Sequence, residues 1–399
     1  MSHSLLSLFG FLGLWGVLAC ASGESDPPPG SSGSGGTAGS TGGNAPSGGK
    51  GGGSNAGRGG ASGGAGSGGT TGGTATTGGA GSGGAPNACR DAGSTGTPRA
   101  ACAAPACYRN LFSEVLGRSP ADVQAKMTGI VQQLFHGTGA EQRIYYELSS
   151  DSSQAFIEDI ASNDIRSEGQ SYGMFVAVHM NMQAEFDKLW RYAKSCMQQP
   201  NGTFAWQMTV DSCSPISTGQ APDGDEYFAE ALRLAHLRWG AGGAFDYRAE
   251  ALKIMAAVAA HDFNRNPAIV KFSANSNFSD PSYVLPLFYS EWACFDTANA
   301  ALWQSATTYA RTFFPRVINA NTGLAPYQSN FDGSQYGPGH TFNADAWRVP
   351  MNIMSDFAVN GAGTWQTDYA ATHAAFWVSE GLETYGGSYT LDGMAMDEN

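Results

Sequence analysis

Over residues 109–399, apolar residues recur at the three- and four-residue spacing of an α-helix, and this spacing constrains the fold more than any other feature. The run from Val123 to Phe135 is an example. Ser119 is suited to cap that helix, and Gly137 is suited to end it. The two-residue alternation that is typical of strands is scarce. The sequence therefore predicts an all-α domain.

The same spacing predicts nine helices, joined by loops rich in Gly, Asn, Ser and Pro. They are the run above and eight more, near 168–181, 184–198, 225–239, 247–261, 281–295 (interrupted by Pro286), 298–314, 343–357 and 366–382. Many are rich in alanine and apolar over a wide arc, which is typical of helices packed on two sides. We therefore expect a toroid of inner helices surrounded by outer ones, with a simple bundle as the alternative. The long polar loops before the helix starts favour the toroid and would line one of its mouths.

Residues 1–20 differ in composition from the rest of the chain. Their apolar stretch is too short to span a bilayer as a mature helix and is typical of an export signal, although no Lys or Arg precedes it. The segment that ends at Cys20 resembles a bacterial lipobox, in which Cys20 would become the acylated first residue. Plain secretion after cleavage near Ala21 is the alternative. We expect an exported protein, either an outer-membrane or cell-surface lipoprotein or a secreted one.

Residues 21–108 form a lead-in that is dominated, as far as Pro86, by Gly, Ser, Thr and Ala. Such sequence buries too little apolar surface to offset the entropy of ordering, so it predicts a disordered linker before the domain. The whole chain has a formal net charge of −13. This charge argues against a nucleic-acid partner and raises no objection to neutral polysaccharides. Membrane contact is expected only through a lipid on Cys20.

Of the seven cysteines, six remain once Cys20 is set aside, and an even number in an exported protein indicates disulfides. Cys102 with Cys107, and Cys196 with Cys213, are close in sequence and are candidate pairs. The sequence holds no CxxC and no HxxxH. We therefore predict neither a metal site nor a cofactor.

Two short motifs place an acid beside a glycine at the start of a helical run. In the first, Glu168 is followed by Gly169 and Gly173, which would leave space on the helix face for a long polymer. In the second, Asp223 and Asp225 stand beside a further glutamate. An acid at a helix start complements the helix dipole, and one Asp is expected to cap the second helix. Crowded acids also raise one another's pKa, as a general acid near neutral pH requires.

Two further acids precede helical runs. Asp345 is followed at i+3 by Arg348, so an ion pair within one helix is the simplest interpretation. In the functional interpretation, Arg348 holds Asp345 ionised and directed into the same mouth as the first two motifs. Asp280 is suited to cap a helix with Pro281 in its first turn. Tyr283 would then project from that turn as a hydroxyl able to orient a water.

Aromatic residues are dense around these acids, and about half of them are expected to belong to the core. Phe204 and Trp206 lie in a predicted loop and are candidates for stacking on sugar rings. Tyr227 and Trp347 adjoin the acidic motifs and are further candidates for substrate contact.

The motifs Glu168-Gly-Gln-Ser-Tyr-Gly-Met, Pro222-Asp-Gly-Asp-Glu-Tyr-Phe, Asp280-Pro-Ser-Tyr and Asp345-Ala-Trp-Arg together resemble glycoside hydrolase family 8 in order and approximate spacing. The second motif, with Leu237-Arg-Trp-Gly at the end of its helix, is most similar to the branch of reducing-end xylose-releasing exo-oligoxylanases and related xylanases. The resemblance implies an (α/α)6 barrel that hydrolyses β-1,4 linkages in xylo-oligosaccharides or xylan with inversion.

The resemblance also implies a role for each site residue. Glu168 would be the general acid that protonates the glycosidic oxygen, and Asp345 the base that activates a water on the opposite face of the sugar. Tyr283 would hold that water, and Asp223 would bind and distort the sugar at the cleavage point. Arg348 would orient Asp345. Inverting enzymes keep the acid and the base roughly 6.5–9.5 Å apart, so that a water fits.

The number of helices departs from the family pattern. Nine is three short of twelve, and the chain stops where the family continues with further helices and, in the exo-acting branch, with a histidine that helps close the cleft. We therefore expect a barrel without its last helices, which would expose apolar helix faces. We expect a monomer. The residues leave open xylan, cellulose, chitosan or mixed-linkage glucan as substrate, and endo or exo action.

Other functions fit parts of the sequence. Gly169, Ser171 and Gly173 match the nucleophile elbow of serine hydrolases, which needs a strand before it, but the preceding segment 162–167 is polar and not strand-like. A non-catalytic surface lipoprotein that captures glycans would use the aromatic residues, yet it would need no acid/base pair. An endo-β-1,4-glucanase of the same family is the third alternative.

Overall fold

The computed structural model describes residues 111–114, 116–139, 142–241, 243–361 and 363–396. The predictions for residues 1–20 and 21–108, including Cys20 and the pair Cys102–Cys107, lie outside these ranges. Among the helices in the described ranges, none combines the length and the apolar character needed to cross a bilayer.

Nine helices of ten or more residues occur in the described part of the chain, which confirms the predicted number. They follow the short α3 (Leu111–Glu114) and are α4 (Pro120–His136), α5 (Ser167–His179), α6 (Gln183–Tyr192), α7 (Pro222–Trp239), α8 (Tyr247–His261), α9 (Pro286–Phe295), α10 (Ala300–Val317), α11 (Val349–Asn360) and α12 (Thr364–Glu380). At the start of α4, the Asp122 amide donates to the Ser119 hydroxyl at 3.0 Å, so the predicted cap is present.

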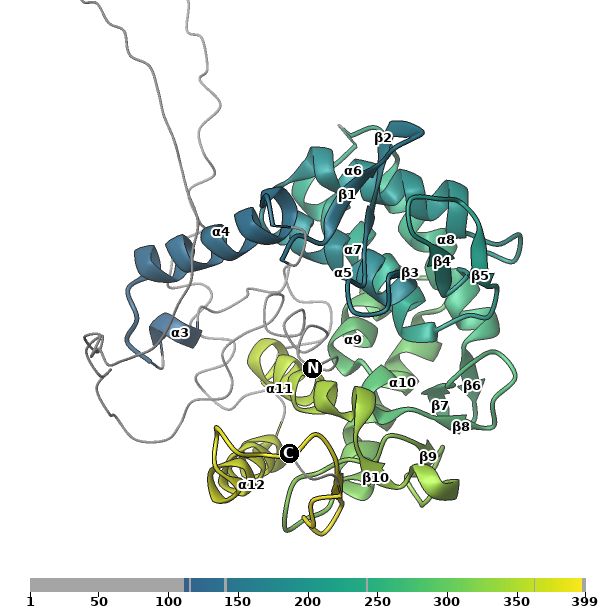
Figure 1. The fold of residues 1–399 in the computed structure, drawn as a ribbon. Helices are drawn as coiled ribbons and strands as arrows, with labels where there is room; N and C mark the ends of the chain where they lie inside the picture. The colour runs from purple at the N-terminus through teal and green to yellow at the C-terminus, as the bar shows by residue number, and fades with distance from the viewer. Residues whose placement is uncertain (1–110, 115, 140–141, 242, 362, 397–399) are drawn as a thin grey trace, which may run out of the picture. The chain divides into compact units, whose positions relative to one another are not determined.

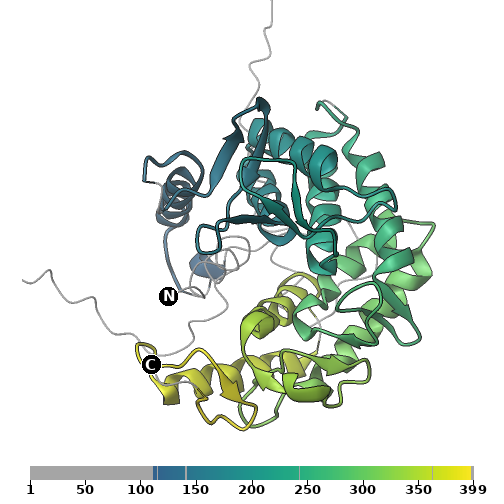
Figure 2. The same ribbon diagram turned by 45° about the vertical axis from the view of Figure 1, so that its right-hand side comes forward.

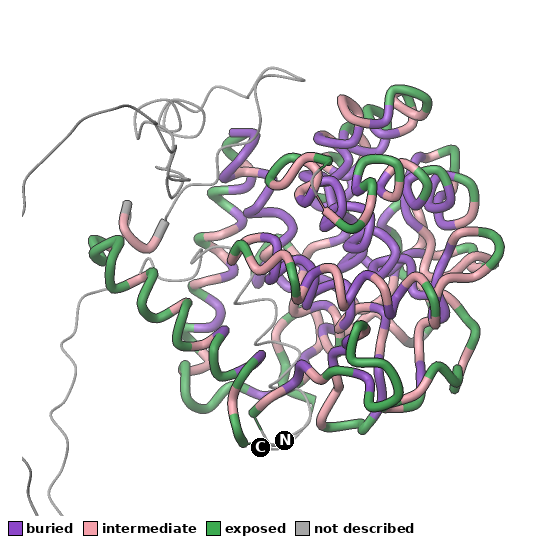
Figure 3. The backbone as a smooth tube through the Cα atoms, turned by 90° about the horizontal axis from the view of Figure 1, so that it is seen from above, coloured by how far each residue is buried: buried purple, intermediate pink, exposed green. Residues whose placement is uncertain are grey.

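The helices form two layers. In Figures 1 and 2 the chain can be traced through them from α4, in blue, to α12, in yellow. The inner helices are α5, α7, α9 and α11, and most of their residues are buried. Each contacts the outer helix that follows it, namely α6, α8, α10 and α12, and α5 contacts α7 as α9 contacts α11. Figure 3 shows the buried segments gathered in the interior and the exposed ones at the periphery. The alternation explains the wide apolar arcs, because an inner helix has neighbours on two sides.

Two inner helices begin later than predicted, because a tight turn precedes each. Over the predicted helix 281–295, the chain first forms a 3-10 turn, Pro281–Tyr283, and α9 starts only at Pro286. Proline lacks an amide hydrogen and disfavours helical backbone in the residue before it, so it suits the first turn of α9 better than its interior. Before α11, the segment Ala344–Arg348 is likewise a 3-10 turn. These turns hold Tyr283, Asp345 and Arg348.

Short antiparallel strands occupy several loops between the helices. They are β1 (Tyr145–Leu148), β2 (Asp151–Ile157), β3 (Asp164–Arg166), β4 (Gln207–Thr209), β5 (Pro215–Ser217), β6 (Phe263–Arg265), β7 (Ala268–Val270), β8 (Phe278–Ser279), β9 (Ser329–Asn330), β10 (Thr341–Phe342) and β11 (Tyr389–Thr390). Apart from the β1–β2 hairpin, none is long enough to show an alternating pattern. In β2 the buried residues are consecutive rather than alternating, so its pattern is not that of a half-buried strand.

The sheet of β3, β4 and β5 brings two distant segments to the start of α5. Ile165 of β3 lies opposite Met208 of β4. The Ser167 amide donates to the Trp206 carbonyl at 2.9 Å, so Trp206 lies beside the first turn of α5. The candidate pair Cys196–Cys213 is confirmed as a disulfide, with 4.8 Å between the two Cα atoms. It ties the end of the α6 region to the β4–β5 loop.

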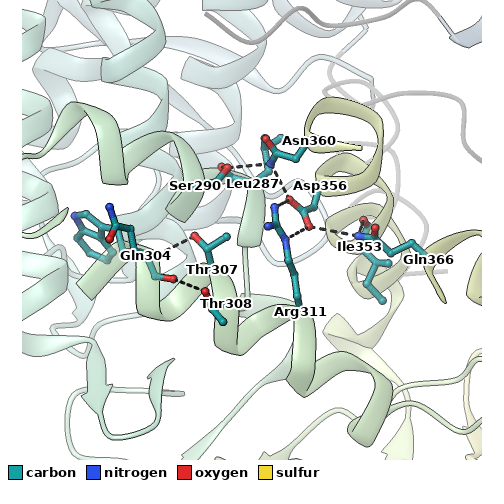
Figure 4. Close-up of polar contacts among 11 residues, drawn as sticks. Leu287, Ser290, Gln304, Thr307, Thr308, Arg311, Ile353, Asp356, Asn360 and Gln366 are labelled. Atoms are coloured by element: carbon teal, nitrogen blue, oxygen red, sulfur yellow. Dashed lines mark hydrogen bonds and ion pairs between the residues drawn. The ribbon is translucent and has the colours of Figure 1, made fainter. Parts of the chain in front are cut away.

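A buried polar cluster joins the last four helices (Figure 4). Asp356 of α11 accepts two hydrogen bonds from Arg311 of α10, at 2.7 and 2.8 Å. Asn360 donates to Asp356 at 2.8 Å and to Ser290 of α9 at 2.9 Å, and Gln366 of α12 donates to Asp356 at 3.3 Å. Asp356 is wholly buried, so its charge is compensated by these donors. The cluster fixes α11, and therefore the turn before it, relative to its neighbours.

Candidate active site

Arg348 joins the beginnings of all four inner helices in one polar network. Its Nη1 lies 2.6 Å from an Asp223 carboxylate oxygen and also donates to the Tyr172 hydroxyl. Its Nη2 lies 3.0 Å from an Asp345 carboxylate oxygen and 3.1 Å from the Ser282 hydroxyl. These partners come from the first turn of α7, the second turn of α5 and the turns before α9 and α11. The structure thus gathers motifs that the sequence separates.

Asp223 is the buried partner of Arg348. It is 1% exposed, and burial raises its pKa while the Arg348 guanidinium lowers it. The expectation that Asp223 or Asp225 caps α7 is wrong, because the helix begins at Pro222 and the residue before it makes no side-chain cap. Asp223 directs one carboxylate oxygen to Arg348.

Glu168 lies in the first turn of α5 and accepts a hydrogen bond from the Ser167 hydroxyl at 3.1 Å. Burial raises its pKa to about 8, together with the charges of Asp223 and Asp345. A carboxyl group with this pKa carries a proton at neutral pH, as a general acid must. The influence of both aspartates places all three carboxyl groups in one electrostatic neighbourhood.

The expectation of open space beside Gly169 and Gly173 is wrong. A Cβ on Gly173 would lie 2.5 Å from the Ile157 side chain, and one on Gly169 would lie 3.6 Å from it. Gly173 allows β2 to pack closely against α5, so its function is structural, whereas a Cβ on Gly169 would make only an ordinary contact with Ile157. Any sugar must reach Glu168 from the helix start and not across this face.

The pKa of Glu168 predicts a pH dependence of both activity and stability. The kcat/KM of the free enzyme should fall as the pH rises through about 8, because the acid loses its proton. Between the unfolded value of 4.5 and about 8, the folded state binds more protons at Glu168 than the unfolded state does. The contribution of this group to the free energy of unfolding therefore falls as the pH rises through that window. Urea unfolding of wild type and Glu168→Gln across this range measures the difference; parallel curves would contradict the assignment.

Asp345 and Tyr283 flank Arg348. The predicted i+3 ion pair of Asp345 with Arg348 is present, and the Asp345 side chain is 33% exposed, so it remains accessible to a water or a sugar. The guanidinium carbon of Arg348 lies 5.5 Å from the centre of the Tyr283 ring, in a cation–π contact. Phe272 stacks on Tyr283 with 5.9 Å between ring centres and 6° between planes. The Tyr283 ring is thereby held in one orientation.

The turn that carries Tyr283 is fixed by several hydrogen bonds. Asp280 accepts from the Ser282 amide at 2.8 Å, which confirms the predicted cap, although the capped element is a 3-10 turn. Asn352 of α11 donates to the Ser282 carbonyl at 2.7 Å. Asp280 is wholly buried, and burial together with the charge of Asp345 raises its pKa well above the usual range. Asp280 therefore adds to the acidic surroundings of Asp345.

Sequence reasoning missed three contacts of Arg348, those with Asp223, Tyr172 and Ser282, and of these only Asp223 was a candidate site residue. Tyr172 lies four residues after Glu168 and so on the same face of α5. That spacing is the one signal that points to Tyr172 before the structure is known. Ser282 carries no signal of its own beyond its position next to Tyr283, because its hydroxyl is relevant only once Arg348 lies beside it.

Two of the aromatic residues predicted to contact sugar are buried against other aromatic rings. Phe204 is 0% exposed and packs on Phe228 with 4.3 Å between ring centres, so it has no free face for a sugar ring. Tyr227 is 5% exposed, and its ring packs edge-on against Tyr172 and Phe288. Phe204 lies in hydrophobic surroundings that its loop position did not reveal, and its prediction as a substrate-stacking residue is wrong. Substrate contact by Tyr227 stays a prediction.

Trp206 and Trp347 are partly exposed. The Arg166 guanidinium lies over the Trp206 ring at 5.8 Å, beside the start of α5. Trp347 stacks on Trp377 with 4.7 Å between ring centres. Substrate contact stays a prediction for both residues.

The serine-hydrolase interpretation is contradicted by the position of Ser171. A short strand, β3, does precede the motif, contrary to expectation. Ser171, however, lies inside α5, is 0% exposed, and donates its hydroxyl hydrogen to the Glu168 carbonyl at 3.0 Å. It therefore does not stand at a sharp turn as an exposed nucleophile. In the described ranges, no group of His, Cys, Asp and Glu side chains is arranged to hold a metal ion.

A sequence profile of glycosyl hydrolases family 8 matches residues 151–365, which contain all four motifs. The chain belongs to glycosyl hydrolase family 8. The reducing end xylose-releasing exo-oligoxylanase of Halalkalibacterium halodurans is 35% identical over 315 residues, which are 73% of this chain and 78% of that protein. Endoglucanase C of Ruminiclostridium cellulolyticum is 30% identical over 60% of this chain and 53% of that protein.

Solved structures show the same relationship within family 8. A variant of Rex8A from Paenibacillus barcinonensis, complexed with 3(3)-alpha-L-arabinofuranosyl-xylotetraose, is 33% identical. It superposes with a TM-score of 0.68 over 73% of this chain and 80% of that chain. Membership of the family makes this protein a glycoside hydrolase, and the two helix layers are those of the (α/α)6 architecture rather than of a simple bundle.

Proposed function

We propose that this enzyme hydrolyses β-1,4 linkages in xylo-oligosaccharides or xylan with inversion of configuration. The observation that carries the proposal is the contrast between two acids in one electrostatic neighbourhood. Glu168 has a pKa of about 8 and so holds a proton at neutral pH, whereas Asp345 is paired with Arg348 at 3.0 Å. Two carboxyl groups in opposite protonation states are what acid/base hydrolysis of a glycoside requires.

The proposed reaction is a single displacement. Glu168 donates its proton to the glycosidic oxygen while the bond from that oxygen to the anomeric carbon breaks. Asp345 accepts a proton from a water, whose oxygen forms the new bond on the opposite face of the sugar. Tyr283 orients this water, Asp223 binds the sugar at the cleavage point, and Arg348 holds Asp345 in position. Release of the products leaves Glu168 ionised and Asp345 protonated, and exchange with solvent restores both.

Inversion is tested by the configuration of the first product. Proton NMR during hydrolysis of xylotriose should show the α anomer of the newly formed reducing end before mutarotation mixes the two forms. A single displacement at a β linkage allows no other outcome. Early appearance of the β anomer would contradict the mechanism. Borohydride-reduced xylotriose, whose reducing end is blocked, is the control that identifies which signal arises from cleavage.

An endo-β-1,4-glucanase activity is the second candidate, favoured by the similarity to Endoglucanase C. The greater identity and coverage of the exo-oligoxylanases favour xylo-oligosaccharides. Comparing kcat/KM on xylotriose and cellotriose decides between them, and higher efficiency on cellotriose would reverse the assignment. Binding of xylan without release of any sugar would instead support the non-catalytic lipoprotein.

We further propose that the enzyme is a monomer exported through residues 1–20 and tethered by a lipid on Cys20, with simple secretion as the alternative. The proposal rests on the lipobox-like sequence and on the Gly/Ser-rich linker that follows it. Incorporation of labelled palmitate that is lost in Cys20→Ala would support the anchor. Absence of label in the wild-type protein would favour secretion. Light scattering tests the proposed monomer, for which it should give the mass of one chain.

A further inference from the structure

The hydroxyl of Tyr289 lies between a buried carboxyl group and the backbone of Tyr283. It is 2.7 Å from Glu226 Oε1 and 3.3 Å from the Tyr283 carbonyl oxygen. Tyr289 is 1% exposed and Glu226 is 0% exposed. Buried polar groups of this kind need partners, and here they supply one another.

This contact connects Tyr283 to the same helix turn that holds Arg348. Glu226 follows Asp223 by three residues, so both lie on one face at the start of α7. Asp223 binds Arg348 directly, and Glu226 reaches Tyr283 through Tyr289 of α9. The start of α7 thus contacts, directly or through Tyr289, two site residues, Tyr283 and Arg348, that lie more than fifty positions further along the chain.

We propose that Tyr289 is a positioning residue that fixes the Tyr283 backbone, and that Glu226 orients the Tyr289 hydroxyl. The inference rests on the proposed function, in which Tyr283 orients the attacking water. The Tyr283 ring is held by Arg348 and Phe272. The carbonyl contact with Tyr289 adds to the hydrogen bonds of Asp280 and Asn352 that hold the turn, and it is the side-chain contact made to the Tyr283 backbone itself. A small shift of that backbone would move the phenol by a comparable distance and misplace the water.

The order of the hydrogen bonds follows from the protonation of Glu226. Burial raises the pKa of Glu226 well above its usual range, which favours the uncharged form that has a hydrogen to donate. Glu226 can then donate to the Tyr289 oxygen, and Tyr289 can donate its own hydrogen to the Tyr283 carbonyl. Glutamine at position 226 can make the same donation through its amide, whereas leucine cannot.

A double-mutant cycle separates positioning from general stability. Tyr289→Phe should lower kcat on xylotriose roughly tenfold with little change in KM, because one hydrogen bond that fixes the water site is lost. Tyr283→Phe should lower kcat further. In the Tyr283→Phe background, Tyr289→Phe should change kcat less than about twofold, because the phenol that it positions is already absent. An equal loss in both backgrounds would overturn the inference.

Matched variants distinguish a loss of positioning from a general loss of stability. Tyr192→Phe also removes a buried hydroxyl that donates to a carbonyl, that of Ser212 at 2.5 Å, and it should lower the thermal midpoint while leaving kcat unchanged. Glu226→Gln should keep kcat within about threefold of wild type, and Glu226→Leu should lower it as much as Tyr289→Phe does. Loss of activity in Glu226→Gln equal to that in Glu226→Leu would overturn the role of Glu226.

The outcomes distinguish this inference from the proposed function. If Tyr283→Phe lowers kcat and Tyr289→Phe does not, the positioning role is wrong and the proposed function stands. If Tyr283→Phe leaves kcat unchanged, the proposed role of Tyr283 is wrong and the positioning role falls with it.

Discussion

Replacing Glu168 with glutamine is expected to lower the turnover of xylotriose roughly a thousandfold while the protein remains folded. The amide cannot donate a proton to the glycosidic oxygen, so the leaving sugar must depart as an alkoxide. The fold should persist because Glu168, with a pKa of about 8, is already uncharged at neutral pH and similar in shape to glutamine. The Ser167 hydroxyl retains an acceptor in the variant. Product chromatography measures turnover, and circular dichroism measures the fold.

Two comparisons make the Glu168→Gln result specific. A xyloside with a good leaving group, such as a dinitrophenolate, needs little protonation, so the variant should lose much less activity on it than on xylotriose. Glu185→Gln changes a partly exposed glutamate on α6, and it should leave activity on both substrates unchanged. Full activity of Glu168→Gln on xylotriose, or equal losses on both substrates, would refute the assignment of the general acid.

Replacing Arg348 with methionine is expected to lower the free energy of unfolding by about 3–5 kcal/mol at neutral pH. The substitution removes the partner of Asp223, which is 1% exposed, and leaves its charge without compensation. In the variant the pKa of folded Asp223 rises further above its unfolded value. Protonation at low pH then neutralises the group, so the deficit relative to wild type should shrink as the pH falls. Urea unfolding at neutral and acidic pH measures both effects.

Arg311→Met is the matched control for this substitution. Arg311 also binds a wholly buried aspartate, Asp356, through two hydrogen bonds, but it contacts none of the proposed catalytic residues. Both variants should be destabilised, whereas only Arg348→Met should lower kcat of the folded protein, because Asp345 loses its orienting partner. Wild-type stability in Arg348→Met, or equal kcat in the two variants, would contradict the proposed network.

The helices could be predicted because their signal is local. An apolar residue every three or four positions marks a buried helix face, and that pattern is complete within one segment, as in the run from Val123 to Phe135. The 3-10 turns before α9 and α11 were not predicted, because their sequences share the composition of helix starts. The short strands were missed because two or three residues hold no periodic pattern, although they bring Trp206 to the start of α5.

The acids at helix starts suggested that the motifs share one mouth of the toroid, and the resemblance to a family implied the role of each residue. Nothing local in Glu168 or Asp345 shows that these two residues meet. Only the tertiary structure determines which aromatic side chains are exposed near the site. Phe204 and Trp206 have the same loop context in the sequence, yet one is wholly buried and the other partly exposed. Phe204 packs on Phe228 of α7, whereas Trp206 lies beside the first turn of α5.

Helix content, the order of the motifs and the types of residue available for acid/base chemistry follow from the chain alone, because each is a property of neighbouring residues. The protonation of Glu168, the pairing of Arg348 with Asp223 and the contact of Tyr289 with Tyr283 arise only in the folded protein. They depend on burial and on distances between segments far apart in sequence, and both are set by how α5, α7, α9 and α11 pack against one another.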